Sequence, residues 1–200
     1  MLLIIIISIL AFLIISFLLN FYKDPKRKIP KGNNLVSPAD GRIISIIDTS
    51  KENLTVNKGL IGKIKTTSKD VSDKCYAISI FMSPIDAHIN RAPIAGTIKS
   101  VKHTKGKFFK AYDLEKSFEN EKNEIIIENK NLKVKVIQIA GFLARRIICN
   151  AKINQKVIKG QKIGMIALGS QTTIIMPKKM KLTINVNDKV KAGESVLADF

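Results

Sequence analysis

The first 22 residues of the chain are MLLIIIISILAFLIISFLLNFY and contain no charged side chain. A run this long and apolar is typical of a helix that crosses a membrane. A helix rises about 1.5 Å per residue, so roughly 20 residues cross the hydrocarbon core of a bilayer. A cleaved signal peptide is the alternative. It fits poorly, because no basic segment precedes the run and no small-x-small site follows it. We therefore expect residues 1–22 to form a membrane anchor.

The segment after the anchor, KDPKRKIPK, is strongly basic. Lysine and arginine next to a membrane span tend to stay in the cytoplasm. We therefore expect residues 23–36 to be a basic linker. The remainder, residues 37–200, would form one folded domain on the cytoplasmic face of the cell membrane.

The formal net charge of +18 indicates an acidic partner. The lysines are scattered along strand-like segments, and the chain has no RNP-type aromatic motif, Cys/His finger or helix-turn-helix, so we expect no nucleic-acid partner. An anionic membrane surface is simpler, since each nearby Lys or Arg contributes about 1 kcal/mol. Cys75 and Cys149 have no metal-ligand spacing and suit a reducing compartment.

Short β-branched runs bounded by Gly, Pro and Asn follow the linker and predict strands. The sequence EIIIENKNLKVKVIQIA predicts a hairpin around residues 129–131. Short helices fit only residues 111–122 and 141–149. The fold class is therefore mainly β, a sandwich or barrel-like fold. The strand candidates are Arg42–Ile47, Tyr76–Met82, Gly96–Val101, Glu124–Glu128, Leu132–Ile139, Lys162–Ala167, Thr172–Met176 and Lys181–Val186.

An internal repeat supports this fold class. The segments NQKVIKGQKIG (Asn154–Gly164) and NDKVKAGESVL (Asn187–Leu197) share the pattern Asn-x-Lys-Val-x-x-Gly. The pattern is similar to the hairpin half-repeats of lipoyl and biotinyl carrier domains. A carrier lysine at Lys181 is the rival interpretation. We reject it, because a carrier lysine lies between two halves of similar size and Lys181 is close to the C-terminus.

A Gly-Ser pair, Gly169–Ser170, stands between the last two long apolar runs. Its simplest interpretation is the turn of a β-hairpin, because Gly supplies a positive φ and Ser bonds locally to the backbone. Serine is also a nucleophile when a base activates it. A Ser-His-Asp hydrolase using Ser170, His88 and Asp40 stays open, although the chain has no G-x-S-x-G elbow.

The loop FMSPIDAHINRAPIAG gathers further reactive side chains: Asp86, His88, Asn90 and Arg91. A rigid loop with an acid, an imidazole and a guanidinium is typical of catalytic sites. The alternative is a hydrogen-bonded turn with a structural histidine. The chain has no His-x-His or His-x-x-x-His pattern, so we expect no metal site.

Taken together, the segments SPADG, IFMSPIDAHINRAPIAG, HTKGKFFKA, ENEKNEIII, IQIAGFLARRI and KGQKIGMIALGS, with Pro177, resemble the short bacterial and archaeal phosphatidylserine decarboxylases. The resemblance implies a proenzyme that cleaves its own Gly169–Ser170 bond. Residues 1–169 would become the β chain and residues 170–200 the α chain, the two staying associated as a heterodimer. Ser170 would become a pyruvoyl group.

The chemistry implied by this resemblance is the decarboxylation of phosphatidylserine to phosphatidylethanolamine and CO2 in phospholipid biosynthesis. Decarboxylating an amino acid leaves a carbanion that needs an electron sink, as pyridoxal phosphate provides elsewhere. A pyruvoyl ketone forms a Schiff base with the substrate and needs neither metal nor pyridoxal phosphate. The Ser170 hydroxyl would attack the Gly169 carbonyl, and Asp40 matches the family's aspartate for self-cleavage.

The longer bacterial relatives carry two histidines, three residues apart, in this loop. Here His88 takes the first position and Arg91 the second, and arginine cannot act as a base. Either His88 serves both steps, or the self-cleavage base lies elsewhere, with His103 as a candidate. We expect His88 to bind substrate and protonate the carbanion. Arg91 would bind the substrate phosphate or carboxylate.

Two positions depart from the pattern of the short enzymes, which usually place a basic residue and then an acid after Gly-Ser. This chain has Gln171 and Thr173 there. Arg145 and Arg146 either contact lipid phosphate or are solvated or paired. Two other functions stay open: decarboxylation of another serine phospholipid or a serine phosphodiester, and an inactive, basic membrane-binding relative.

Overall fold

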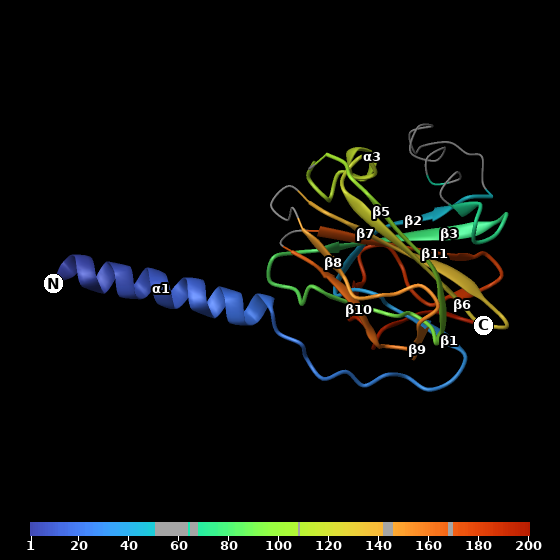
Figure 1. Cartoon of the computed structure of the whole chain (residues 1–200), viewed down its shortest axis with the longest axis horizontal. Helices are drawn as coiled ribbons and strands as arrows, with labels where there is room; N and C mark the ends of the chain where they lie inside the picture. The colour runs from blue at the N-terminus through green and yellow to red at the C-terminus, as the bar shows by residue number, and fades with distance from the viewer. Residues whose placement is uncertain (51–63, 65–67, 108, 142–145, 168–169) are drawn as a thin grey trace.

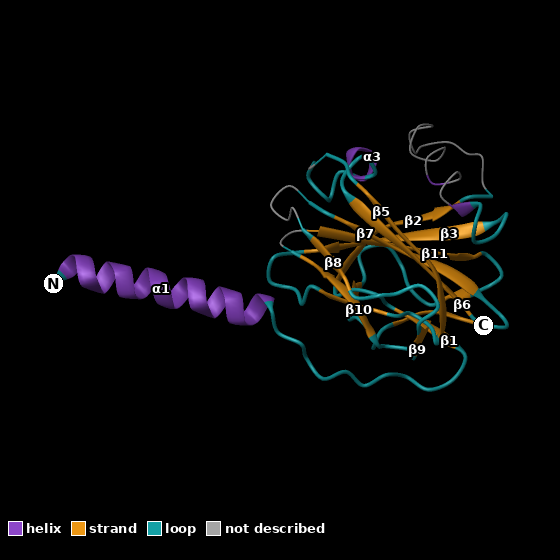
Figure 2. Cartoon of the chain, viewed as in Figure 1, coloured by secondary structure: helices purple, strands orange, loops and turns teal. Residues whose placement is uncertain are grey.

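The computed structural model describes residues 1–50, 64, 68–107, 109–141, 146–167 and 170–200. Strands are the main regular structure of the domain, and one long helix stands at the N-terminus (Figure 2). The expected mainly-β fold class is confirmed. The elements are α1 (Leu2–Phe21), β1 (Asn34–Val36), β2 (Gly41–Asp48), β3 (Cys75–Met82), β4 (Ile89–Arg91), β5 (Gly96–Thr104), α3 (Leu114–Ser117), β6 (Lys122–Glu128), β7 (Lys133–Ile139), β8 (Ile147–Cys149), β9 (Lys156–Val157), β10 (Lys162–Ile166), β11 (Ser170–Pro177), β12 (Lys181–Leu182), β13 (Lys189–Val190) and β14 (Val196–Asp199).

Within the described residues the strands form one long and two short sheets, all with antiparallel neighbours. The long sheet has the order β13-β2-β3-β11-β7-β6-β5-β9 and curls into a half-barrel (Figure 1). The short sheets, β1-β14-β12 and β4-β10-β8, share one hydrophobic cluster with it. This cluster is the main core, so the fold is the expected sandwich or barrel-like one.

Strand β11 is the most enclosed element of the long sheet. It pairs with β3 on one edge and β7 on the other, and all its residues are buried. Ile174 and Met176 face the main core, whereas Ile175 packs in a second cluster on the opposite face. Because both edges and both faces are covered, every polar group of β11 must find a partner inside the protein.

The internal repeat found in the sequence is a structural repeat. Asn154 and Asn187 both have positive φ (67° and 78°), as do Gly160 and Gly193 (80° and 78°). Each repeat pairs with a matching strand start in the same register: β9 pairs with Gly96–Thr97 of β5, and β13 with Gly41–Arg42 of β2. The two segments therefore share the same backbone turns and the same kind of strand pairing.

Most expected strands, the hairpin of β6 and β7, and a short helix within residues 111–122 are confirmed. Three expectations are wrong. Lys181–Val186 is a strand only over Lys181–Leu182, because the Asn185 N–H bonds to the Asp188 carboxylate in a turn. A helix does not span residues 141–149, because Ile147–Cys149 form strand β8. Residues 142–145 lie outside the described part.

The third error is the β-hairpin expected around the Gly-Ser pair. Strand β10 pairs with β4 and β8, whereas β11 pairs with β3 and β7, so the two runs belong to different sheets. The short strands β1, β4, β9, β13 and β14 were also not expected from the sequence. They span two to four residues, too few for a periodic pattern to show.

The basic segment after α1 is held against the domain. The Asp24 carboxylate forms ion pairs with Arg91 and Lys162, and the Lys28 N–H donates to the Glu194 carboxylate at 2.8 Å. Ile29 packs where the two repeats meet, since its side chain is the nearest neighbour of Gly160 and Gly193. Residues 23–31, which we call the strap, thus lie across the point where the two repeats meet.

Gly96 begins β5 where the strand approaches β6 closely, and this gives a test of the packing. A Cβ at Gly96 would lie 2.5 Å from the Glu128 carbonyl oxygen. We expect Gly96→Ala to lower the free energy of unfolding by about 2 kcal/mol or more, because two backbones must separate. Gly32→Ala is the control: its φ is +92° but its Cβ would meet nothing closer than 3.8 Å. Denaturant unfolding of the three proteins measures the difference, and equal losses would contradict the close approach.

Candidate active site

Ser170 is the first residue of β11 and is fully buried. It stands opposite Met82 of β3, and its Oγ donates to the Met82 sulfur at 3.5 Å. A thioether is a weak acceptor, so this hydroxyl is held loosely for a buried group. Gly169, the other half of the expected cleavage bond, lies outside the described residues.

A chain of buried amides starts beside Ser170 and runs across the sheet. Asn90 Nδ2 donates to Thr172 Oγ1 at 3.0 Å, and Gln138 Nε2 donates to Asn90 Oδ1 at 2.8 Å. Asn123 Nδ2 then donates to Gln138 Oε1 at 2.9 Å. All four residues are buried, so the network holds strand β4 against β11. Removing one member would leave a buried polar group without its partner, which lowers stability.

The two residues that depart from the family pattern bond to each other. Gln171 Nε2 donates to Thr173 Oγ1 at 2.9 Å, and Thr173 Oγ1 lies 3.0 Å from Ser79 Oγ. Ser117 Oγ of α3 donates to Gln171 Oε1 at 3.2 Å. A neutral, hydrogen-bonded pair therefore stands where the short enzymes usually have opposite charges, and a buried position accommodates it without desolvating an ion.

His88 precedes β4 and is fully buried. Its Nδ1 lies 2.8 Å from the Asp86 carbonyl oxygen, which can only accept, so Nδ1 carries the proton. The Nε2 lone pair has no hydrogen-bond partner among the described residues. Burial lowers the pKa of His88, opposed by the Asp86 carbonyl and the nearby Asp86 and Asp40 carboxylates. At neutral pH the ring is thus a neutral, oriented base.

The last residue of α1, Phe21, covers His88. The two ring centroids are 4.3 Å apart, and Phe21 is only 2% exposed. His88 and Asn90 share one side of β4 because side chains alternate along a strand. The His88 ring therefore lies on the side of β4 from which Asn90 reaches Thr172 of β11, and it packs against the end of the N-terminal helix.

Asp40 is bound to the strap and forms no hydrogen bond to Ser170 or His88. Its carboxylate accepts two bonds from Arg27 Nη2, at 2.7 and 2.8 Å, and one from the Ala192 N–H at 2.7 Å. The Arg27 side chain is 7% exposed and also lies 3.6 Å from Glu194. The hydrogen-bonded Ser-His-Asp arrangement of a hydrolase is therefore absent from these three described residues.

Arg91 points away from Ser170 and His88. It lies on the other side of β4, where Nη1 donates to the Gly160 carbonyl at 2.9 Å and Nη2 pairs with Asp24. His103, the other candidate base, lies on β5 with its side chain half exposed, and its Nε2 is 3.6 Å from Glu121. The structure thus places Asn90 against β11 and His88 on the same side of β4, whereas Arg91 and His103 bond to other parts of the domain.

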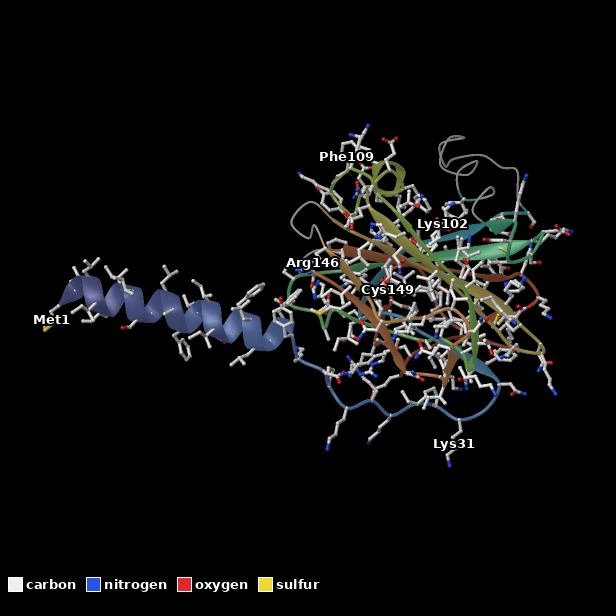
Figure 3. All side chains as sticks on the ribbon, in the orientation of Figure 1. Met1, Lys31, Lys102, Phe109, Arg146 and Cys149 are labelled. Atoms are coloured by element: carbon white, nitrogen blue, oxygen red, sulfur yellow. The ribbon has the colours of Figure 1, made fainter. Side chains whose placement is uncertain are left out.

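The remaining candidate groups have ordinary surroundings. Arg146 is exposed, at the end of the domain nearest α1, and Arg145 lies outside the described residues (Figure 3). Burial raises the pKa of the Cys75 thiol to about 11, so Cys75 is an unreactive core residue. No cluster of three or more His, Cys, Asp or Glu side chains suited to a metal occurs in the described part of the chain.

Comparisons with known proteins identify the family. A family model described as phosphatidylserine decarboxylase matches residues 14–198. The chain belongs to this family. The putative archaetidylserine decarboxylase proenzyme of Methanocaldococcus jannaschii is 43% identical over 92% of this chain and 90% of its own length. The phosphatidylserine decarboxylase proenzyme of Chlorobium phaeobacteroides is 38% identical, covering 94% and 81%, and that of Wolbachia from Brugia malayi 39%, covering 90% and 74%.

Several residues at the site of this phosphatidylserine decarboxylase family member were not predicted from the sequence. Phe21 was counted with the anchor and Arg27 with the basic linker, because contacts across the fold leave no local pattern. Gln138 did carry a signal. It interrupts the apolar run VKVIQIA at an inward position, where a polar side chain needs a buried partner.

The lowered pKa of His88 predicts a pH dependence of stability. The unfolded chain takes up a proton at this residue as the pH falls through its ordinary value of 6.5, and the folded chain only at a lower pH. Protonation therefore favours unfolding, and stability should fall as the pH drops below 6.5. His88→Gln should remove part of that fall. Thermal unfolding in detergent measures it, with His103→Gln as the matched control; identical acid limbs in wild type and His88→Gln would contradict this account.

The buried pair of Arg27 and Asp40 predicts a second effect on stability. Arg27→Met should cost about 3 kcal/mol or more, because it leaves the Asp40 charge buried without its partner. The double variant with Asp40→Asn should recover much of that loss. A double-mutant cycle by denaturant unfolding measures the coupling. Additive losses would show that the pair does not couple the strap to the domain.

Proposed function

We propose that this chain is a proenzyme that becomes a pyruvoyl-dependent phosphatidylserine decarboxylase by cleaving its own Gly169–Ser170 bond. Family membership supports the reaction class, that of a carboxy-lyase. The observation that carries the finer proposal is the position of Ser170. Its hydroxyl is fully buried at the first residue of the central strand, and its hydrogen-bond partner there is a thioether.

Self-cleavage uses the hydroxyl of Ser170. Its oxygen attacks the Gly169 carbonyl carbon, and the amide becomes an ester. Elimination then releases the carboxylate of Gly169 and leaves a dehydroalanine at residue 170. Its imine tautomer is hydrolysed by water, which releases ammonia and leaves a ketone at residue 170. The surroundings fit that product, because losing the hydroxyl forfeits only a weak bond to the Met82 sulfur.

His88 is the base and acid of the proposed mechanism. Its Nε2, which has no hydrogen-bond partner in the described part of the chain, is available to take a proton, and Nδ1 is held by the Asp86 carbonyl. Asp40 acts through its charge, which raises the pKa of His88, since its own oxygens are engaged by Arg27 and Ala192. The pyruvoyl carbonyl would supply the electron sink for the carbanion left when carbon dioxide departs.

Arg91, by contrast, is assigned to the strap and not to the substrate. Its guanidinium is committed to Asp24 and to the Gly160 carbonyl, on the side of β4 away from Ser170. The second histidine position of the longer relatives is therefore structural in this chain. His88 then serves both self-cleavage and decarboxylation.

The two fragments stay associated after cleavage. Residues 170–200 contain β11 to β14, and β11 lies between β3 and β7 of the larger fragment. β13 pairs with β2, and β14 pairs with β1. Separating the fragments would expose a central strand with both edges unpaired. The product is thus a heterodimer held by the original fold.

Helix α1 anchors the protein in the membrane, with the domain on the cytoplasmic face. It is the one helix in the described part of the chain that is long and apolar enough to cross a bilayer. The lysines of the strap follow it directly, as expected for a cytoplasmic flank. An anchored enzyme reaches a substrate that never leaves the bilayer.

A second candidate substrate is another serine phospholipid. The relative from Methanocaldococcus jannaschii, at 43% identity, is named for archaetidylserine. Both substrate names share the serine headgroup, on which the reaction takes place. Assays with the two lipids in matched vesicles distinguish the candidates by their relative kcat/KM.

Replacing the attacking hydroxyl tests the proposal. Wild type should migrate as two fragments, residues 1–169 and 170–200, and release carbon dioxide from phosphatidylserine. Ser170→Ala keeps the backbone pairing of β11, so it should fold, remain a single chain and release none. Gel electrophoresis and a carbon dioxide assay measure both properties.

Ser79→Ala is the matched control. Ser79 is also a buried strand hydroxyl, bonded to Thr173, but it does not stand at the cleavage bond. This variant should still cleave and retain activity. Decarboxylation by an uncut Ser170→Ala protein would reject the role of Ser170.

A further inference from the structure

The N-terminal helix meets the domain at the loop that carries His88. Figure 1 shows α1 standing clear of the sheets, with only its C-terminal end against them. There Phe21 is buried on His88, and Asn20 Nδ2 donates to the Ile85 carbonyl at 3.3 Å. The rest of α1 is exposed and almost wholly apolar, as a surface in contact with lipid must be.

The strap prevents the domain from swinging away from the helix. Phe21 and Asp24 are both fixed to the domain, and Arg27 follows with its bidentate bond to Asp40. These anchor points follow one another at intervals of three residues, so little free chain separates them. Where the helix leaves the bilayer therefore sets how deep the neighbouring loop lies.

The loop between β3 and β4 presents an apolar side chain at that level. Ile85 is 73% exposed, although its backbone contacts the helix end. The loop is rigid, because the Asp86 carboxylate accepts from the Ser83 N–H at 2.8 Å and from Ser83 Oγ at 2.7 Å. Tyr22, 60% exposed, follows α1 directly, and tyrosine is enriched at membrane–water interfaces.

We propose that Ile85 enters the lipid bilayer beside α1, so that the β3–β4 loop docks the His88 end of the domain on the membrane. The partner is the bilayer surface, argued from the continuity of Ile85 and Tyr22 with the apolar helix. Exposed isoleucines elsewhere, such as Ile153, are single surface residues and carry no such meaning.

This docking explains how the substrate reaches a buried site. His88 lies three residues after Ile85, so its ring sits at the depth of lipid headgroups once Ile85 is inserted. A serine headgroup then reaches Ser170 and His88 without its acyl chains leaving the membrane. That consequence rests on the proposed decarboxylase activity, whereas the docking itself rests only on the proposed membrane anchoring of α1.

The chain contains no tryptophan, which allows a direct test. Ile85→Trp and Ile153→Trp each place one fluorophore at an exposed isoleucine, the first at the proposed contact and the second as the matched control. In vesicles of phosphatidylserine and phosphatidylcholine, Ile85→Trp should emit at shorter wavelength. Brominated acyl chains should quench it several-fold more strongly than Ile153→Trp. Equal emission and quenching at the two positions would overturn the proposal.

A second variant links docking to turnover. Ile85→Asp should cleave itself normally but decarboxylate vesicle phosphatidylserine about tenfold more slowly, because a buried charge at the interface opposes insertion. Unchanged turnover would overturn the proposal. If wild type released no carbon dioxide at all, the proposed function would fail, and the tryptophan experiment would still decide the docking.

Discussion

The complete enclosure of strand β11 is the constraint on which the rest of the structure depends. Both edges of β11 are hydrogen-bonded and both faces are packed in the core, so its polar side chains cannot bond to solvent. Asn90 and Ser79 must therefore supply partners for Thr172 and Thr173 of β11, and Gln138 in turn holds Asn90. A slip of one residue would turn these polar groups into the wrong face. The register thus fixes Ser170 opposite Met82.

The N-terminal segment contacts the candidate active site directly. Phe21 packs on His88, and Arg27 holds the Asp40 carboxylate, so two of the expected catalytic residues touch chain outside residues 37–200. Helix α1, the strap and the His88 loop form one connected unit. Under the proposal that α1 anchors the chain in the bilayer, this connection orients the candidate site toward the membrane, which a flexible tether would not do.

The sequence predicted the elements with strong patterns and missed those defined by distant contacts. The long β-branched strands, the apolar helix and the Asn-x-Lys-Val-x-x-Gly repeat are local features, and the repeat even shows in the matching φ angles of Asn154 and Asn187. The hairpin at the Gly-Ser pair was wrong because strand pairing is settled by burial of both faces of β11. Motifs singled out His88 and Ser170 as candidates, but no motif showed that Arg27 would bind the Asp40 carboxylate.

The intact mass of the purified wild-type protein tests the central claim most directly, because it measures the bond between Gly169 and Ser170 and the group that remains. The account predicts two masses, one for residues 1–169 with a normal carboxyl terminus. The other, for residues 170–200, should be lighter by one ammonia than a fragment beginning with serine, as a ketone in place of the amine requires. One mass corresponding to the uncut 200-residue chain, in a preparation that decarboxylates its lipid, would contradict it.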